Sequence, residues 1–450
     1  MAIRGILYFY ILLVAAISLL SYKKGIFLIW LTFLLTPIMI LVSGIKLGLS
    51  LMTVLMIISV GSEFRFNDRR RLWKEFLTNN QKAITVYICI SLSIVFLSQT
   101  VPLKTQLHRL LDEFAIIIFS LQTFMIAKGN RLFSTTLMGI VSGVVIFNLL
   151  YCVCFEVILG LNPAGLPLYM YMGNYDDDFF VDAVDAERGA LSFRAQTVYG
   201  HPLSLGQYML AFLPLFLING KWKFKYLYTF IICLLIVLTG TRGAIVPMTI
   251  IILMAIKRWL SVPKLCTFIL LLFVCVFFIP DRQLDRFNKE VEPYVASFMF
   301  WDDSKQKEND IKGSSMEMRF EQFDAANKEI EDNPIFGRGY GYREYWQMEH
   351  KGLHPELLGY ESLIIYYLVE RGWLGLLFFF FFAFYIYKIF RNNTMEIWAV
   401  RLVFVGYLLS IIMTGVRPLS LLFVCLSCSI ICGLNSKLEG YSINASVDRC

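Results

Sequence analysis

The sequence predicts an all-α polytopic membrane protein with about 12 or 13 transmembrane helices and a large helical loop outside the membrane. Of its 450 residues, 57% are hydrophobic and 17% are charged, whereas soluble domains carry about 25% charged residues. The mean hydropathy is +0.63. The chain holds 39 Phe and 23 Tyr, which fits a lipid-facing surface bordered by aromatic side chains.

Apolar runs give the positions of the expected spans. They lie near residues 5–20, 25–43, 46–60, 83–99, 114–127, 132–160, 204–219, 226–240, 242–256, 265–280, 362–388, 400–415 and 419–435. Several runs are shorter than the roughly 20 residues that a helix needs to cross a bilayer, so we expect some spans to be tilted or broken. The N-terminal runs divide in more than one way, which leaves the number of spans open by one.

Two long loops divide the chain into four regions. The expected regions are an N-terminal transmembrane bundle at 1–160, a central segment with the first loop at 161–280, a large loop at 281–361, and C-terminal transmembrane helices at 362–450. Within the large loop, residues 315–330 (SMEMRFEQFDAANKEI) have apolar positions at helical spacing, which predicts an amphipathic helix. A Gly-rich turn at residues 337–341 follows it.

Short basic loops indicate the orientation in the membrane. They lie at residues 23–24, 65–74, 128–131, 221–225, 257–264 and 388–391, and they alternate with loops poor in Lys and Arg. Basic loops stay on the cytoplasmic side, so both long loops fall outside. The net charge of +7 comes largely from these loops, and we expect no nucleic-acid partner.

Arg242 is the most informative residue, because it lies within a long apolar stretch (LLIVLTGTRGAIVPMTIIILM, residues 234–254). A guanidinium stays charged at any relevant pH, and at mid-bilayer depth it costs about 2.5–3.5 kcal/mol on insertion scales. Gly240 and Gly243 predict a tight turn that places Arg242 at the outer interface, where it can bind a lipid headgroup. Arg417 repeats the pattern in TGVRP, between two further apolar runs.

Other cationic side chains fall on the same predicted side, including Arg194, Arg319, Arg338, Arg343 and all four histidines. Arginine binds diphosphate well because its planar fork makes two parallel hydrogen bonds to phosphate oxygens. The Gly-rich turn can add backbone N–H donors. Interface contacts or salt bridges to the acidic loops explain Arg338, Arg343 and Arg417 equally well. For Arg194 and Arg242 we favour anion binding.

His354 and Glu361 lie just before the apolar run at 362–388, where either could act as a general base. Taken singly, each residue is better explained by a structural role, His354 as an exposed loop histidine and Glu361 as a helix N-terminal acid. The sequence has no nucleophile elbow, P-loop or H-E-x-x-H spacing. The acidic run at residues 176–178 fits a solvated turn better than a cation site. We therefore expect no metal and no cofactor.

Four segments in this order resemble the O-antigen ligase/polymerase family. They are residues 194–202 (RAQTVYGHP), 238–244 (LTGTRGA), Arg319 followed by 333–341 (NPIFGRGYG), and 354–375 (HPELLGYESLIIYYLVERGWLG). The resemblance covers about residues 190–380. It departs at one position, because Glu361 stands where the family usually has a histidine, and the nearest histidine is His354.

The resemblance implies a bacterial inner-membrane glycosyltransferase whose active site faces the periplasm. The donor would be an undecaprenyl-diphosphate-linked glycan, and the reaction would be metal-independent and inverting. The diphosphate would be bound by arginines, the acceptor hydroxyl deprotonated by Glu361 or His354, and the remaining substrate contacted by His201 and Tyr340. The diphosphate-binding set is Arg194, Arg242, Arg319, Arg338 and Arg417. A chain-length regulator is a further expected partner.

Three readings remain open from the sequence. A polymerase of O-antigen, capsule or exopolysaccharide repeat units is favoured, since polymerising members of the family often vary at the position of Glu361. Its alternative is a ligase that transfers the glycan to lipid A core. A transporter or flippase is a further alternative, but transporters place ionisable residues near the midplane and often contain inverted repeats. A structural protein would leave Arg242 and Arg417 unexplained.

Overall fold

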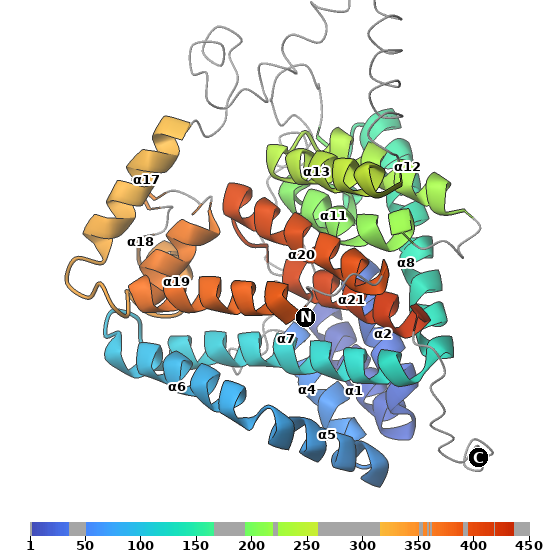
Figure 1. Ribbon diagram of the computed structural model, residues 1–450, viewed down its shortest axis with the longest axis horizontal. Coiled ribbons are helices and arrows are strands. Elements are labelled where there is room, and N and C mark those ends of the chain that lie inside the picture. The colour runs from blue at the N-terminus through green and yellow to red at the C-terminus, as the bar shows by residue number, and fades with distance from the viewer. Residues whose placement is uncertain are drawn as a thin grey trace, which may run out of the picture.

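The computed structural model describes residues 2–35, 51–165, 194–218, 224–259, 316–350, 354–357, 360, 362–389, 395–417 and 419–435. Every regular element in these ranges is a helix (Figure 1). This confirms the predicted all-α class. The expected span at 265–280, the acidic run at 176–178 and Glu361 lie outside the described residues.

Helix length and composition confirm a polytopic membrane protein. Within the described ranges, four helices are long and apolar enough to cross a membrane: Leu103–Gly129, Arg131–Ile158, Leu363–Phe384 and Ile397–Thr414. A bent pair, α5 (Asn67–Asn79) and α6 (Gln81–Leu97), meets at 75° and passes the same test as one unit. Further described helices are apolar but shorter, which agrees with the expectation that some spans are short or broken.

The N-terminal part packs around aromatic side chains. It comprises α1 (Ala2–Leu20), α2 (Tyr22–Leu35), α4 (Leu51–Glu63), α7 (Leu103–Gly129) and α8 (Arg131–Tyr151). Trp30, Phe33 and Phe119 are fully buried where α2 meets α7. The Trp30 indole donates a hydrogen bond to Thr123 Oγ1 at 3.1 Å, which satisfies its polar atom inside the core.

The basic segment that the sequence analysis treated as a loop forms helix α5. Its Trp73 is 3% exposed and donates to Glu63 Oε2 at 3.0 Å, while Arg69 pairs with the other oxygen of Glu63. The remaining basic side chains stay exposed. An amphipathic, basic helix of this kind suits a membrane interface. It was not predicted as a helix because its many charged residues are typical of a loop between spans.

The C-terminal half surrounds α11 (Pro202–Ile218). This helix contacts α12 (Lys225–Leu238), α13 (Arg242–Trp259), α20 (Met395–Thr414) and α21 (Ser420–Asn435). Its side chains are buried on all sides, as a helix that is hydrophobic all round requires. Four neighbouring helices therefore pack against α11.

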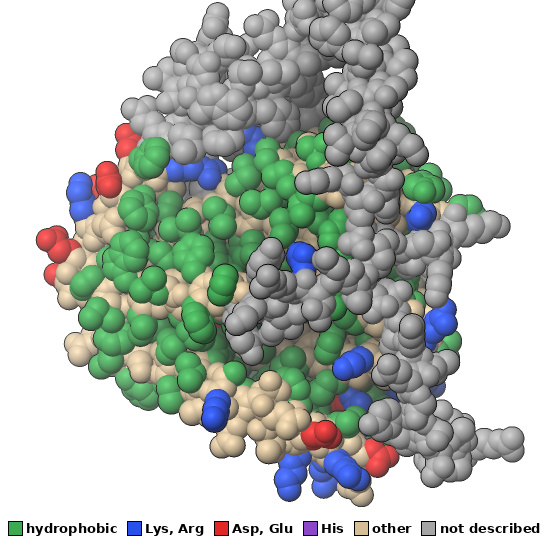
Figure 2. Space-filling model, in the orientation of Figure 1, with side chains coloured by type: hydrophobic (Ala, Val, Ile, Leu, Met, Phe, Trp, Pro, Cys, Tyr) green, Lys and Arg blue, Asp and Glu red, His purple; other side chains and the backbone are tan. Residues whose placement is uncertain are grey.

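A smaller unit lies beside this bundle (Figure 1). It consists of α17 (Met316–Glu329), α18 (Tyr342–His350) and the first half of α19 (Leu363–Ile389). The predicted amphipathic helix is confirmed as α17, whose Ala326 is fully buried in a second core with Leu357 and Val369. Figure 2 shows hydrophobic side chains over most of the face formed by α6, α7 and α19, with charged side chains gathered toward its edges.

Candidate functional site

The predicted turn at Arg242 is present. Helix α12 ends at Leu238 and α13 begins at Arg242. Gly240 between them has φ 59°, a left-handed conformation that glycine adopts without steric cost. The turn therefore joins two apolar helices and places a guanidinium at their shared end.

Arg194 lies against this turn. Its Nε donates to the Thr239 carbonyl at 2.9 Å, and the Ala195 N–H donates to the Leu238 carbonyl at 2.9 Å. Both contacts satisfy carbonyls at the end of α12 that have no partner in the helix. Arg194 is 8% exposed and Arg242 is 9% exposed. Two arginines from segments far apart in sequence are thus brought to one turn.

The C-terminal end of α20 lies against the same turn. Helix α20 ends at Thr414, and Gly415 has φ 76°. Gln207 on α11 donates to the Gly415 carbonyl at 2.7 Å. A Cβ added to Gly243 would lie 2.1 Å from Thr414 Cγ2, so glycine permits this close approach.

We call residues 194–197, 239–243 and 414–417 together the arginine corner. Arg417 belongs to it because it follows Thr414, which closely approaches Gly243, by three residues. Three of the five predicted diphosphate-binding arginines therefore gather at the helix ends that surround α11: Arg194, Arg242 and Arg417.

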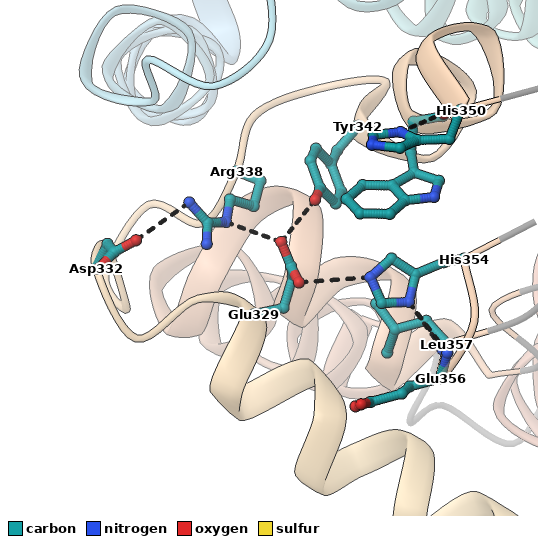
Figure 3. A network of polar contacts seen from close by, with 9 residues as sticks. Glu329, Asp332, Arg338, Tyr342, His350, His354, Glu356 and Leu357 are labelled. Carbon is teal, nitrogen blue, oxygen red and sulfur yellow. Dashed lines mark hydrogen bonds and ion pairs between the residues drawn. The ribbon is translucent and has the colours of Figure 1, made fainter.

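Glu329 at the end of α17 is the centre of a second group, the Glu329 cluster (Figure 3). Its carboxylate accepts a hydrogen bond from the Tyr342 hydroxyl at 2.6 Å, pairs with Arg338 Nε at 3.2 Å, and faces His354 Nε2 at 3.5 Å. Arg338 also pairs with Asp332 at 3.4 Å. Burial and the bond to Glu329 raise the pKa of Tyr342, so this phenol stays a donor. Arg338 is neutralised within the protein here.

Both ring nitrogens of His354 have partners within the protein. Its Nδ1 accepts from the N–H groups of Glu356 at 3.3 Å and Leu357 at 3.1 Å, so this nitrogen carries no hydrogen. Nε2 therefore carries it and faces Glu329. His354 is 7% exposed and lies 4.4 Å from the Trp346 ring. As a general base it would first have to leave these partners, and that role stays a prediction.

The Gly-rich turn inserts into a break in α19. Gly372 has φ 62° and ψ −169°, which interrupts the helix. Arg338 N–H donates to the Val369 carbonyl at 2.8 Å, and Gly339 N–H donates to the Glu370 carbonyl at 3.0 Å. On the other side of the break, Trp373 N–H donates to the Pro334 carbonyl at 2.9 Å. In this conformation α19 therefore binds two of the N–H groups that were expected to contact a phosphate, those of Arg338 and Gly339.

Arg371 secures the inserted turn. It makes a bidentate salt bridge to Glu113 on α7, at 3.2 and 2.7 Å. Its guanidinium also lies 4.6 Å from the Tyr340 ring centroid and 4.1 Å from that of Tyr367. Tyr340 is only 2% exposed, so this conformation does not present it to a sugar. Its predicted substrate contact stays untested.

Residues 227–380 match the family model described as O-antigen ligase. The chain carries an O-antigen ligase domain. The match supports the family resemblance predicted from the sequence, and the family suggests an activity of the O-antigen ligase/polymerase type. No curated protein matches the chain.

The O-antigen ligase domain does not contain the whole site. It includes Arg242, Arg338 and the break in α19, but Arg194 and Arg417 lie outside residues 227–380. The arginine corner therefore combines the domain with the segment before α11 and the end of α20. Ser362 Oγ, at the start of α19, donates to the Ile412 carbonyl at 2.8 Å, which joins the domain to the same end of α20.

Two further predicted residues, His201 and Arg319, take no part in the contacts described above. His201 is exposed, and its Nδ1 accepts from Leu203 N–H at 3.1 Å at the start of α11. Arg319 lies in the first turns of α17 and is half-buried. Within the described ranges no three His, Cys, Asp or Glu side chains are grouped to hold a metal ion.

Four charged residues that shape the O-antigen ligase domain and its surroundings were not predicted from the sequence: Glu113, Glu156, Glu329 and Arg371. Three of them lie in candidate membrane spans. A charged residue within an apolar span is costly and is kept for a reason. That signal was present in the sequence for Glu113, Glu156 and Arg371.

Proposed function

We propose that this protein is a polymerase that joins glycan repeat units carried on undecaprenyl diphosphate at the outer face of the bacterial inner membrane. One observation carries the donor part of this proposal: Arg194 and Arg242, which belong to different segments, lie at one helix turn in a protein with an O-antigen ligase domain. The choice of a polymerase rests on Glu361, because polymerising members of the family that the chain resembles often vary at this position. Arginine pairs at a membrane boundary suit a lipid diphosphate.

Helix α21 supports the proposed orientation. This helix of 16 residues starts beside the arginine corner, where Ser420 N–H donates to the Arg417 carbonyl at 3.0 Å. At its other end, a Cβ added to Gly433 would lie 2.5 Å from the Ala127 carbonyl, next to the basic residues Lys128 and Arg131. Basic loops face the cytoplasm. The arginine corner, about 24 Å away at 1.5 Å per residue, would then face outward.

The chemistry is a displacement at the anomeric carbon of the donor glycan. The acceptor hydroxyl oxygen forms the new C–O bond, the bond from carbon to the phosphate oxygen breaks, and the lipid diphosphate leaves with that electron pair. Fixed guanidinium groups stabilise the charge that develops on the leaving group, which removes the need for a metal. Attack from the opposite face inverts the anomeric configuration. Glu361 would accept the proton, because both ring nitrogens of His354 are already bound.

Glycan analysis of a cell without the protein tests this proposal. Loss of a polymerase leaves single repeat units on the acceptor. Loss of a ligase leaves complete chains on undecaprenyl diphosphate, and loss of a flippase traps repeat units on the inner leaflet. The expected result is single repeats, restored to polymer by the wild-type chain. Either of the other two patterns would refute the polymerase.

A further inference from the structure

We propose that Glu156 is a positioning residue for the donor site: it holds the segment 194–199 in the conformation that places Arg194 on the Thr239–Arg242 turn. This inference rests on the proposed function, since it gives Arg194 a role in binding the lipid diphosphate. Glu156 itself contacts no substrate. It acts through backbone groups of the segment that carries Arg194.

Glu156 lies in the π-helical turn Cys152–Ile158 that follows α8. It is 3% exposed and belongs to a candidate membrane span. A buried carboxylate is costly unless hydrogen bonds satisfy it. Glu156 accepts from Thr197 N–H at 2.7 Å, from Gln196 N–H at 3.0 Å and from Asn162 Nδ2 at 3.1 Å. Two of these three donors are backbone groups of the segment that carries Arg194.

The segment adopts a conformation that needs such support. Thr197 has φ 49°, a left-handed value that is strained for a β-branched residue. Its hydroxyl donates to Asn148 Oδ1 at 2.6 Å, and its carbonyl accepts from Asn162 Nδ2 at 3.0 Å. The N–H, hydroxyl and carbonyl of this residue are thus bound by Glu156, Asn148 and Asn162, which lie on the π-helical turn, on α8 and in the segment after the turn.

The constraint passes directly to Arg194. Gln196, whose N–H is bound by Glu156, is two residues from Arg194. Between them, Ala195 N–H donates to the Leu238 carbonyl, so the backbone is fixed at both sides of this short path. The Arg194 side chain then reaches the Thr239 carbonyl. Release of the segment from Glu156 would free Arg194 from the turn that holds Arg242.

A double-mutant cycle on the full-length protein in nanodiscs tests this inference. The probe is undecaprenyl diphosphate, and the measurement is its dissociation constant. Arg194→Ala and Glu156→Ala should each weaken binding about tenfold, and the double variant should be no weaker than Arg194→Ala, because coupled residues are not additive. Glu156→Gln keeps one oxygen for Thr197 N–H and should recover part of the affinity.

Glu63→Ala is the matched control. Glu63 is also a fully buried carboxylate, but it binds Arg69 and Trp73 near α5, so its loss should leave the dissociation constant unchanged. If Glu156→Ala does not fold, Asn162→Ala removes a donor to both Glu156 and the Thr197 carbonyl and should weaken binding in the same coupled way.

The outcomes separate the two proposals. Normal binding by Glu156→Ala and Asn162→Ala, alongside weakened binding by Arg194→Ala, would overturn the role of Glu156 and leave the donor site intact. Additive effects in the double variant would also overturn it, since they would mean that Glu156 acts on stability elsewhere. Normal binding by Arg194→Ala would refute the donor site itself and with it the positioning role.

Discussion

Two helix breaks in this protein look alike in sequence but have different roles. At Gly240, with φ 59°, and at Gly372, with φ 62°, an apolar helix is interrupted next to an arginine. In each case another segment supplies hydrogen bonds to the broken end: Arg194 and Ala195 at the first, the Gly-rich turn at the second. Broken helices are tolerated in membranes only when such partners exist.

The difference lies in the arginine. Arg371 turns into the protein, where Glu113 neutralises it and two tyrosine rings cover it. Arg242 instead shares its turn with Arg194, and the break that carries Arg417 lies beside it. The first break is a structural joint between the O-antigen ligase domain and α7. The second gathers cations, which is what a diphosphate site requires.

The joint at Gly372 should tolerate no side chain. A Cβ at this position would lie 2.3 Å from the Ile335 carbonyl, with φ at 62°. Gly372→Ala should therefore yield little or no folded protein, measured as recovery of the monodisperse protein from membranes. Gly143→Ala is the control, because a Cβ there meets nothing within 4 Å and alanine suits a helix interior. Normal yield of Gly372→Ala would mean that the inserted turn is not needed.

The Glu113–Arg371 pair should matter for stability and not for the donor. Glu113→Ala leaves a largely buried guanidinium without its carboxylate, which costs about 3 kcal/mol. We expect a lower unfolding temperature in detergent, with an unchanged dissociation constant for undecaprenyl diphosphate below that temperature. Replacement of both residues by leucine should recover part of the loss. A raised dissociation constant for Glu113→Ala would mean that the break at Gly372 also contributes to donor binding.

Arg242→Lys should give the opposite pattern. Lysine keeps the charge but loses the planar fork that binds two phosphate oxygens, so glycosyl transfer should fall about tenfold while protein levels and unfolding temperature stay normal. Shorter polymers from cells with this variant would report it. Arg69→Lys, at the far basic helix α5, is the matched control and should leave polymer length unchanged. Full-length polymer from Arg242→Lys would argue against a diphosphate clamp.

Local signals in the sequence were enough to predict one of the two breaks. Glycines around Arg242 in an apolar stretch predicted the turn, and helical spacing predicted α17; both are confirmed. The partner of Arg371 could not be found this way, because Glu113 lies 258 positions away. For the same reason the Gly-rich turn was expected to offer its N–H groups to a phosphate, although α19 binds those of Arg338 and Gly339. Contacts of this kind depend on how helices pack, which a single sequence does not reveal.

Glu156 shows another limit of prediction from a single sequence. As a carboxylate in an apolar run it was detectable, but its purpose depends on a segment 40 positions later. The basic helix α5 was missed for a simpler reason. Its high charge masked Trp73, the side chain that anchors it to Glu63. Charge patterning predicted an orientation in the membrane, but it concealed the secondary structure of α5.

For His354 the sequence and the structure suggest different roles. The family resemblance implied a catalytic role, whereas in the structure the ring stabilises a loop. Its Nδ1 binds the N–H groups of Glu356 and Leu357, a role that an asparagine oxygen can fill at the same position. His354→Asn should therefore keep glycosyl transfer within about twofold and leave its pH profile unchanged. His354→Leu cannot bind these N–H groups and should lower stability by about 1 kcal/mol. If His354→Asn instead abolishes transfer in a stably folded protein, the ring must leave Glu329 during the reaction, and the base would be His354 rather than Glu361.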